Sequence, residues 1–569
     1  MPRLLTSLLL LASTTVLAQD RTNARSMVIS RFGIVATSQV QASQAGAEIL
    51  SRGGSAVDAA IAANATLGVM EPDMNGMGGD LFAIYWDARS GKLYGLNASG
   101  WAPKALTIEH LKSKGDARMP TAGIDTVTVP GAVEGWRELH ERFGRLAWKD
   151  LFAPAIFYAE NGFPVQEMIG ADWKASETKL LQDPESRRVF LVNDHAPQMG
   201  ELFKNPDLAK ALGLLAAEGP RAFYSGEIAQ SVLQTEREHG GVMQADDLKD
   251  FTAEWVEPIS ITYRGWKVYE LPPNVQGMAA LAMLNIMEQF QPAKDGPLSA
   301  EEIHKRIEAM KLAYADLARY NADPRFAKIP VAGLLSKDYA RRRAQLIDPQ
   351  KANCNPQAGQ PPSSDTTYLT AVDREGNIIS LIQSNFSGFG SGITVHGMGF
   401  ALQNRGALFM LDPSKPDALA PRKRPFHTII PAFMEHGDDH IGFGIMGGAN
   451  QPLAHAQFVS NVVDYGMNLQ AAMETARFTV RDNFDLTCKI LIEDRVSADV
   501  RQQLTSMGHQ LVVRGDFSLF MGRGQAIDHN TGTGMNFAAS DARTDGSAEP
   551  ELPPALLPTK NEAGRTNSQ

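Results

Sequence analysis

Cysteine is scarce in this chain of 569 residues, which contains only Cys354 and Cys488. Two cysteines are too few for a zinc site built from thiolates. Basic blocks are also rare, since none exceeds three residues, as in Arg422–Arg424, and the formal net charge is -10. This charge argues against nucleic acid as a partner. Gly-x-Ser-x-Gly, His-Glu-x-x-His and phosphate-binding glycine loops are absent from the sequence. We therefore expect neither a metal nor a cofactor.

Long apolar runs are missing beyond the first residues of the chain. The run Leu4–Leu17 follows Arg3 and ends in small residues before Gln19. A short apolar stretch of this kind is typical of a cleavable signal peptide, which we place at residues 1–18. The alternative is a membrane-anchoring N-terminus. We expect no other membrane span and a periplasmic or secreted protein, in which two cysteines can form a disulfide. The sequence leaves open whether they pair.

The composition is that of an ordinary globular protein, with 43% hydrophobic and 21% charged residues. Hydrophobic periodicity and turn residues predict a mixture of helices and strands. The expected helices cover 41–70, 301–320, 452–463 and 468–477, and the expected strands 81–86, 92–96, 263–269, 366–372, 377–383, 429–433 and 440–445. Residues 349–365 are polar and proline-rich, which indicates a flexible linker. Residues 547–569 are predicted to be a disordered tail.

The junction between Asp365 and Thr366 carries the chemistry that the sequence suggests. Here the polar linker ends and a strand begins with two threonines. A break at this bond would give Thr366 a free α-amino group, whose ordinary pKa is about 7.7–8.0. Its neutral form can take the proton from the threonine hydroxyl, so that one residue supplies both nucleophile and base. A pair of threonines at the start of a strand is much more often plain β-structure, so the rest of the chain must decide.

Several other segments resemble the γ-glutamyltranspeptidase family, in the same order and over residues 30–546. They are Gly53–Ala60, Gly76–Asp80, Val129–Val133, Ala153–Ile156, Gly219–Tyr224, Glu308–Lys311, Asp365–Tyr368, Gly390–Gly392, Arg422–Pro425, Gly447–Gly448 and Ala539–Asp541. The resemblance implies an N-terminal-nucleophile hydrolase with an α+β, four-layer αββα sandwich. It also implies a precursor that cleaves itself into a large subunit, 19–365, and a small subunit, 366–546, within one intertwined domain.

The resemblance also assigns roles to individual residues. Thr366 would be the nucleophile, and Ser384 would be a second hydroxyl that supports it. Gly447 and Gly448 match the family's oxyanion donors, whose backbone N–H groups stabilise developing negative charge by about 3 kcal/mol. The same glycine pair would also suit a simple turn between a strand and a helix.

The residues that bind the γ-glutamyl group in the family are replaced by other residues in this chain. The arginine that binds the α-carboxylate is replaced by Ser99, and the acidic residue that binds the α-amino group is replaced by Leu408. Arg405 is new, and we expect it either to bind a substrate carboxylate or to be an ordinary structural arginine. The family's serine pair is replaced by His427 and Thr428. Both, together with Asn385, are expected to line the substrate site, although a lone histidine beside a proline is more often structural.

These observations predict an amide hydrolase or acyltransferase that acts on a small-molecule amide, with a possible amine or peptide acceptor. The first hypothesis is a γ-glutamyltransferase or glutathione hydrolase. The second is an amidohydrolase or acylase of the same family, because the segments around Gln383–Asn385 and Phe426–Thr428 resemble oxamate-type amidohydrolases and cephalosporin-type acylases. The third is a non-catalytic binding protein on this scaffold.

Overall fold

Two seven-stranded antiparallel sheets form the centre of the protein in the computed structural model, which describes residues 24–355, 365–480 and 487–554. Hydrogen-bonded neighbours follow one another in each sheet. The first sheet runs β1 (Val28–Ser30), β18 (Met535–Ser540), β17 (Arg523–Asn530), β13 (Asp439–Met446), β12 (Ala432–His436), β9 (Trp266–Glu270) and β8 (Ile259–Tyr263). The second runs β19 (Ser547–Pro550), β2 (Ile34–Thr37), β10 (Asp365–Val372), β11 (Ile378–Phe386), β3 (Asp80–Asp87), β4 (Lys92–Ala98) and β7 (Glu254–Val256).

The sheets pack face to face through alternate apolar side chains of their strands. Phe82 and Ile84 of β3 and Tyr368 of β10 meet Phe433 of β12 and Ile527 of β17 in one buried cluster. Intervening residues point to the opposite faces, as expected where the side chains of a strand alternate. For example, Leu369 of β10 and Ala526 of β17 belong to the two outer clusters. Both faces of each sheet are therefore buried.

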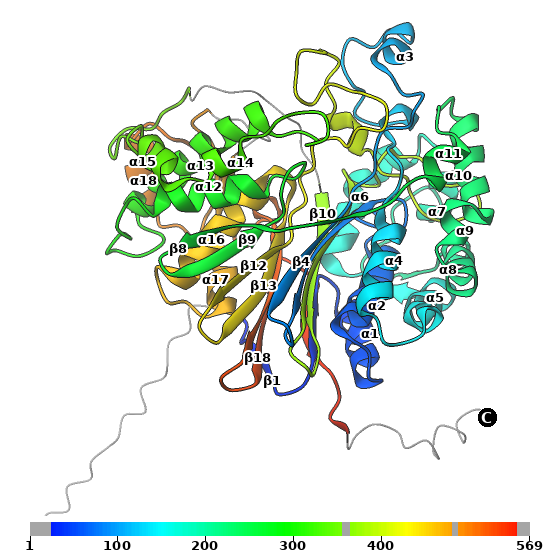
Figure 1. Ribbon diagram of the computed structural model, residues 1–569, viewed down its shortest axis with the longest axis horizontal. Helices are drawn as coiled ribbons and strands as arrows, with labels where there is room; N and C mark the ends of the chain where they lie inside the picture. The colour runs from blue at the N-terminus through cyan, green and yellow to red at the C-terminus, as the bar shows by residue number, and fades with distance from the viewer. Residues whose placement is uncertain (1–23, 356–364, 481–486, 555–569) are drawn as a thin grey trace, which may run out of the picture.

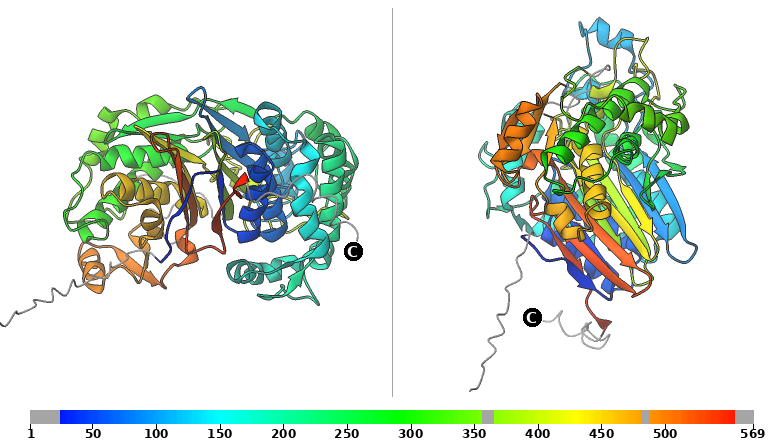
Figure 2. Two further views of the ribbon diagram at one scale, coloured as in Figure 1. Left: turned by 90° about the horizontal axis from the view of Figure 1, so that it is seen from below. Right: turned by 90° about the vertical axis from the view of Figure 1, so that its left-hand side faces the viewer.

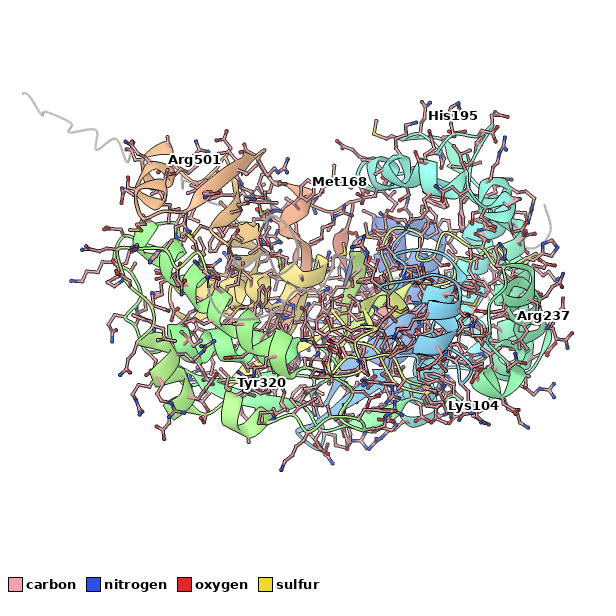
Figure 3. The ribbon with its side chains drawn as sticks, turned by 90° about the horizontal axis from the view of Figure 1, so that it is seen from above. Lys104, Met168, His195, Arg237, Tyr320 and Arg501 are labelled. Carbon is pink, nitrogen blue, oxygen red and sulfur yellow. A yellow bond between two sulfur atoms is a disulfide. The ribbon has the colours of Figure 1, made fainter. Side chains whose placement is uncertain are left out.

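Helices cover the two outer faces, which completes the four-layer αββα sandwich (Figures 1 and 2). The second sheet is covered by α1 (Val40–Ser51), α2 (Ala56–Met70), α4 (Ala132–Phe143), α5 (Ala153–Asn161) and α8 (Pro206–Glu218), with α6 (Glu167–Leu180), α7 (Pro184–Phe190), α9 (Arg221–Tyr224), α10 (Glu227–Glu238) and α11 (Ala245–Lys249) beyond them. The first sheet is covered by α12 (Gly277–Met287), α13 (Ala300–Tyr320), α15 (Lys337–Ala344), α16 (Gln451–Val463), α17 (Leu469–Glu474) and α18 (Ala498–Ser506). In Figure 3, Arg237 of α10 and Arg501 of α18 mark the two helical sides.

Helix α2 shows why these residues form these elements. Its sequence is rich in alanine, a strong helix former, and Ser55 caps it by accepting a hydrogen bond from the Asp58 backbone N–H at 3.1 Å. The Asp58 carboxylate returns the bond to the Ser55 N–H at 2.9 Å. The predicted α+β class and the four-layer sandwich are confirmed.

Two predictions of elements were wrong. Residues 263–269 are not one strand, because Arg264 and Gly265 both adopt positive φ, 47° and 92°, and form the turn of the β8–β9 hairpin. The predicted tail does not begin at 547, because Ser547–Pro550 form β19 and pair with β2. The predicted signal peptide, residues 1–18, lies outside the described residues, as does most of the predicted linker.

Candidate active site

Thr366 lies at the beginning of β10, in the middle of the second sheet. Strand β10 pairs with β11 so that Asp365 faces Phe386 and Thr367 faces Gln383, with an irregular register between them. Thr366 is thereby placed opposite Ser384 and Asn385. The bulge turns one residue out of the regular alternation of the strand, which brings the Thr366 side chain to the end of the inter-sheet space.

The Thr366 hydroxyl is buried and borders a small pocket. Gln451, the first residue of α16, donates from Nε2 to Thr366 Oγ1 at 3.3 Å, and its own Oε1 accepts from the Ile430 N–H at 3.0 Å. The pocket holds about 30 Å³ and is lined by Thr366, Met74, Met446, Gly447, Leu519, Gly522 and Arg523. The predicted nucleophile and one predicted oxyanion glycine therefore share a cavity.

Gly447 and Gly448 connect β13 to α16. Their φ angles are 135° and 59°, values that favour glycine. Gly448 begins the 3₁₀ turn Gly448–Asn450, which leads directly into α16. The N-terminus of a helix collects backbone N–H groups that have no partner within the helix, and its dipole favours negative charge. This position suits the predicted oxyanion role, and Gln276 fixes the loop by donating to the Gly448 carbonyl at 2.8 Å.

Arg405 links two of the predicted site residues. Its guanidinium donates to Thr428 Oγ1 at 2.8 Å and to Ser384 Oγ at 3.1 Å, and it lies 4.3 Å from the centre of the Phe386 ring. The side chain is completely buried. Burial lowers the pKa of the Arg405 guanidinium to about 9, against the opposing effect of the Asp80 carboxylate. Arg405 thus remains a cation at neutral pH, held directly behind Ser384.

His427 forms a buried pair with Asp80, at the start of β3. The distance from His427 Nε2 to Asp80 Oδ2 is 2.9 Å, and neither side chain is exposed. Burial, followed by the charges of Arg405 and Arg424, holds the pKa of His427 well below its ordinary value. A neutral imidazole therefore donates from Nε2 to the carboxyl group. This pair connects the Thr428 segment to the second sheet.

Ser99 and Asn385 are both buried. Ser99 donates to Asn97 Oδ1 at 2.7 Å and is the acceptor for Asn274 Nδ2 at 3.3 Å, so its hydroxyl belongs to a polar network at the end of β4. Asn385 donates to the backbone carbonyls of Pro72 and Asn75 at 3.2 and 3.0 Å. Neither residue borders the pocket beside Thr366. Leu408 is also buried, so no acidic group replaces the family's carboxylate at this position.

The sequence did not indicate three residues of this site. Gln451 binds the threonine hydroxyl, and Arg523 lines its pocket. Glu71 accepts from Thr367 Oγ1 at 2.8 Å and from Ser38 Oγ at 2.8 Å, and burial raises its pKa. All three lie far from Thr366 along the chain, in segments where no local pattern signals a site.

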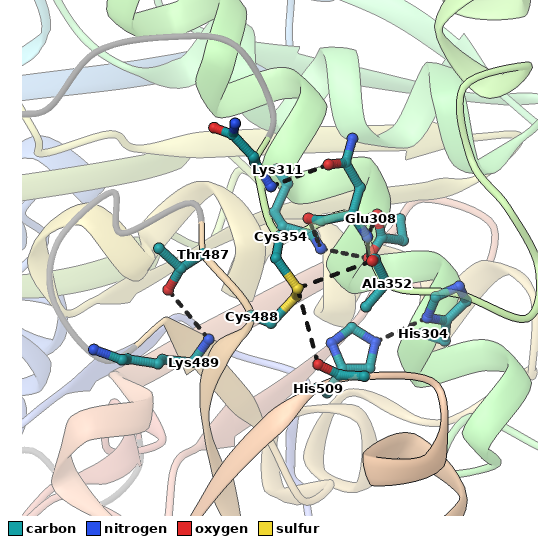
Figure 4. Close-up of a disulfide and its surroundings, with 12 residues drawn as sticks. His304, Glu308, Lys311, Ala352, Cys354, Thr487, Cys488, Lys489 and His509 are labelled. Atoms are coloured by element: carbon teal, nitrogen blue, oxygen red, sulfur yellow. Dashed lines mark hydrogen bonds and ion pairs between the residues drawn. A yellow bond between two sulfur atoms is a disulfide. The ribbon is translucent and has the colours of Figure 1, made fainter.

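The two cysteines form a disulfide, which connects the end of the large-subunit segment to the small-subunit segment (Figure 4). Beside it, His304, Glu308 and His509 are the one group within the described ranges whose side chains are close enough to share a metal ion. Lys311 Nζ lies 2.5 Å from Glu308 Oε1, and His304 Nδ1 lies 2.8 Å from His509 Nε2. Glu308 is thus paired with a lysine and the two histidines with each other, while His509 Nδ1 is buried without a hydrogen-bond partner.

Comparison with known proteins places this geometry in a family. The family model of γ-glutamyltranspeptidase matches residues 42–551. The chain belongs to the γ-glutamyltranspeptidase family. The glutathione hydrolase-like YwrD proenzyme of Bacillus subtilis is 37% identical over 92% of this chain and 99% of its own length. The oxamate amidohydrolase proenzyme of Klebsiella pneumoniae is 33% identical over 91% and 98%. The crystal structure of a cephalosporin acylase from Bacillus halodurans superposes with a TM-score of 0.87 and 40% identity, over 96% of this chain and 100% of the acylase.

Membership of the γ-glutamyltranspeptidase family makes this chain an N-terminal-nucleophile hydrolase. Its relatives are named as proenzymes, which implies a precursor that is cleaved into two subunits. They also divide between glutathione hydrolases, an acylase and an oxamate amidohydrolase. Across the described residues, no helix has the length and apolarity needed to cross a membrane.

Proposed function

We propose that this precursor cuts itself between Asp365 and Thr366 and then hydrolyses amides by means of Thr366. In the first step the Thr366 hydroxyl oxygen attacks the Asp365 carbonyl carbon, and the peptide C–N bond breaks. The nitrogen keeps its own hydrogen, takes the hydroxyl proton and becomes the α-amino group, while the Asp365 acyl group becomes an ester on the hydroxyl oxygen. Water then hydrolyses the ester. The observation that carries the proposal is the pocket shared by Thr366 and Gly447.

Turnover would repeat the same chemistry on a substrate. The neutral α-amine takes the hydroxyl proton as the oxygen attacks the substrate carbonyl, and the oxyanion forms beside the N–H groups of Gly447 and Gly448. The proton passes to the leaving amine as the C–N bond breaks. Water, deprotonated by the α-amine, releases the acyl group as a carboxylic acid. We propose that Ser384, held by Arg405, supports the attacking hydroxyl.

The substrate that we propose is an amide with an anionic acyl group that lacks the α-amino group of glutamate. Arg523 lines the pocket of Thr366, and Arg405 donates to Ser384, which lies opposite Thr366 on the neighbouring strand. Leu408 offers no negative charge for a substrate ammonium group. Asn385, His427, Thr428 and Ser99 lie outside the lining of the pocket, and we propose that they hold the substrate site in place from behind. The two cationic side chains would attract a carboxylate and repel an ammonium.

The second candidate is a glutathione hydrolase or γ-glutamyltransferase, which the resemblance to the YwrD proenzyme favours. Succinyl-p-nitroanilide and γ-glutamyl-p-nitroanilide separate the two candidates, because they differ mainly in the α-amino group and in chain length. We expect kcat/KM for the succinyl compound to be at least about tenfold higher. A preference for the γ-glutamyl compound, with transfer to a dipeptide, would establish the second candidate instead.

Self-cleavage is tested separately with Thr366→Ala. This variant should remain one uncut, inactive chain on a reducing gel, whereas Thr366→Ser should still be cut because it keeps a hydroxyl. Edman degradation of the small fragment should read Thr-Thr-Tyr-Leu. Cleavage of the alanine variant at the same bond would rule out this nucleophile, and an uncut wild-type chain would favour a non-catalytic binding protein.

Export to the periplasm or the medium is proposed from residues 1–18. The Cys354–Cys488 disulfide supports it, because disulfides persist in oxidising compartments. Fractionation of cells that express the full chain should find the processed protein outside the cytoplasm. Deletion of residues 1–18 should leave it in the cytoplasm.

A further inference from the structure

Arg523 is a buried cation in the pocket of the nucleophile, and nothing in the sequence pattern marked it. It is the first residue of β17 and pairs directly with Met446 of β13, the residue before Gly447. Arg523, Gly447 and Thr366 all line the same cavity of about 30 Å³. The arginine is therefore placed at the oxyanion loop by the register of the first sheet.

The side chain of Arg523 points into the space between the sheets. Residues alternate along β17, and Ile527, four positions further on, belongs to the inter-sheet cluster together with Met446. Gly522 allows the start of β17 to lie close to the end of β13, because a Cβ on Gly522 would lie 2.3 Å from the Met446 carbonyl oxygen. A Cβ on Gly447 would in turn lie 2.9 Å from Gly522 Cα. The backbone at Gly522 and Arg523 is thus packed tightly against the Gly447 loop, which would receive the oxyanion.

The guanidinium is held on one side by a carboxylate. Its Nη2 donates to Asp172 of α6, and its Nη1 lies 3.9 Å from Met74 Sδ. The Arg523 side chain is 8% exposed and that of Asp172 is 24% exposed, so the pair lies at the edge of the buried site. Helix α6 also carries Met168, which is labelled in Figure 3. The charge of Arg523 also acts on the buried Glu71 and opposes the effect of burial on the pKa of that carboxyl group. A planar guanidinium presents its donors in a fork that matches a carboxylate, so a substrate carboxylate can replace Asp172 as its partner.

We propose that Arg523 is the specificity-determining residue that binds the distal carboxylate of the acyl group, and that this carboxylate competes with Asp172 for the guanidinium. This inference rests on the proposed function and identifies the side chain that recognises the anionic acyl group. Arg405 is a poor candidate for this contact, because Thr428 and Ser384 already accept from it. A pocket with room for about two water molecules suits a carboxylate on a short chain. The substrate class is therefore the monoamide of a short dicarboxylic acid.

Arg523→Gln tests the proposal when it is assayed with two anilides that differ only at the far end of the acyl chain. Succinyl-p-nitroanilide ends in a carboxylate and butyryl-p-nitroanilide in a methyl group. We expect kcat/KM for the succinyl compound to fall roughly 10- to 100-fold, with less than about a threefold change for the butyryl compound. Arg523→Lys should recover part of the loss. Arg343→Gln is the control and should change neither value, because it removes a partly buried arginine of α15 that pairs with Asp316 of α13 at 3.1 Å.

Asp172→Asn keeps Arg523 and removes only the competing charge, so it provides a second test if Arg523→Gln is not processed. The KM for the succinyl compound should fall about three- to tenfold and that for the butyryl compound should stay the same. An unchanged succinyl-to-butyryl ratio in Arg523→Gln, or an unchanged or higher succinyl KM in Asp172→Asn, would overturn the role of Arg523. The proposed substrate class is tested separately with the wild type. If the processed wild-type enzyme does not prefer the succinyl compound, the substrate class is wrong, whatever the role of Arg523.

Discussion

The Thr366 hydroxyl depends on a single side-chain contact for its orientation in the described structure, the 3.3 Å bond from Gln451. Gln451→Ala should therefore lower kcat roughly 10- to 100-fold, because a misplaced nucleophile loses the near-attack geometry. Gln457→Ala is the matched control, because Gln457 lies further along the same helix and its side-chain amide donates to the backbone carbonyls of Leu453 and Phe478. Steady-state kinetics of the two processed variants provide the comparison. Equal effects on kcat would show that Gln451 has only a structural role.

Asp80 should make stability depend on pH. Burial raises its pKa to about 7, whereas an unfolded aspartate has a pKa of about 3.9. Between these values the folded state holds a proton that the unfolded state has released. The contribution of Asp80 to the free energy of unfolding is therefore fully present below about pH 4. It is lost as the pH rises towards 7, by at most about 1.4 kcal/mol per pH unit.

Asp80→Asn removes this titration, and the neutral imidazole of His427 can change tautomer to accept from the new amide. Thermal denaturation from pH 4 to 8 should show the stability of the wild type falling relative to the variant as the pH increases. Parallel curves for the two proteins would contradict the raised pKa.

At the scale of elements, the loop that we propose to receive the oxyanion, Gly447–Gly448, is positioned by the close approach of β13 and β17. Gly522 has φ 79°, and a Cβ there would meet the Met446 carbonyl. Gly522→Ala should therefore cost about 1–3 kcal/mol of stability and lower kcat, since the loop at Gly447 must shift. Gly515→Ala, where a Cβ meets nothing within 4 Å, should change neither. Chemical denaturation and kinetics of both variants test this, and an unaltered Gly522→Ala protein would show that the loop tolerates the shift.

The sequence predicted those elements whose signal is local. The hairpin of β3 and β4, helix α13 and the strand that begins at Thr366 all follow from periodicity and turn residues. The β8–β9 turn was missed because Arg264 is not a residue that usually marks positive φ. Strand β19 was missed because its short polar sequence becomes a strand only by pairing with β2. Gln451, Glu71 and Arg523 depend in the same way on tertiary packing, while the resemblance to a family supplied Thr366 and the glycine pair.

At the scale of the whole molecule, the disulfide joins residues on either side of the proposed cut. Cys354 precedes Asp365, and Cys488 follows Thr366. Processed protein should therefore run as one species on a non-reducing denaturing gel and as two on a reducing gel. Cys354→Ser should give two species in both. Two fragments without reductant in the wild type would show that the bridge is absent from the mature protein.

The second sheet contains strands from both sides of the proposed cut, and they are interleaved at two places. Strand β2 lies between β19 and β10, and β11 pairs with β3. Neither half can therefore complete this sheet alone. In the precursor these strands pair within one chain. After cleavage, reduction and denaturation, the two fragments must first associate before the strands can pair. Refolding of the reduced, denatured mature enzyme should therefore become slower on dilution. The lifetime of the active mature enzyme then depends on a slow rate of unfolding. The folding rate of the precursor, in contrast, should not depend on its concentration.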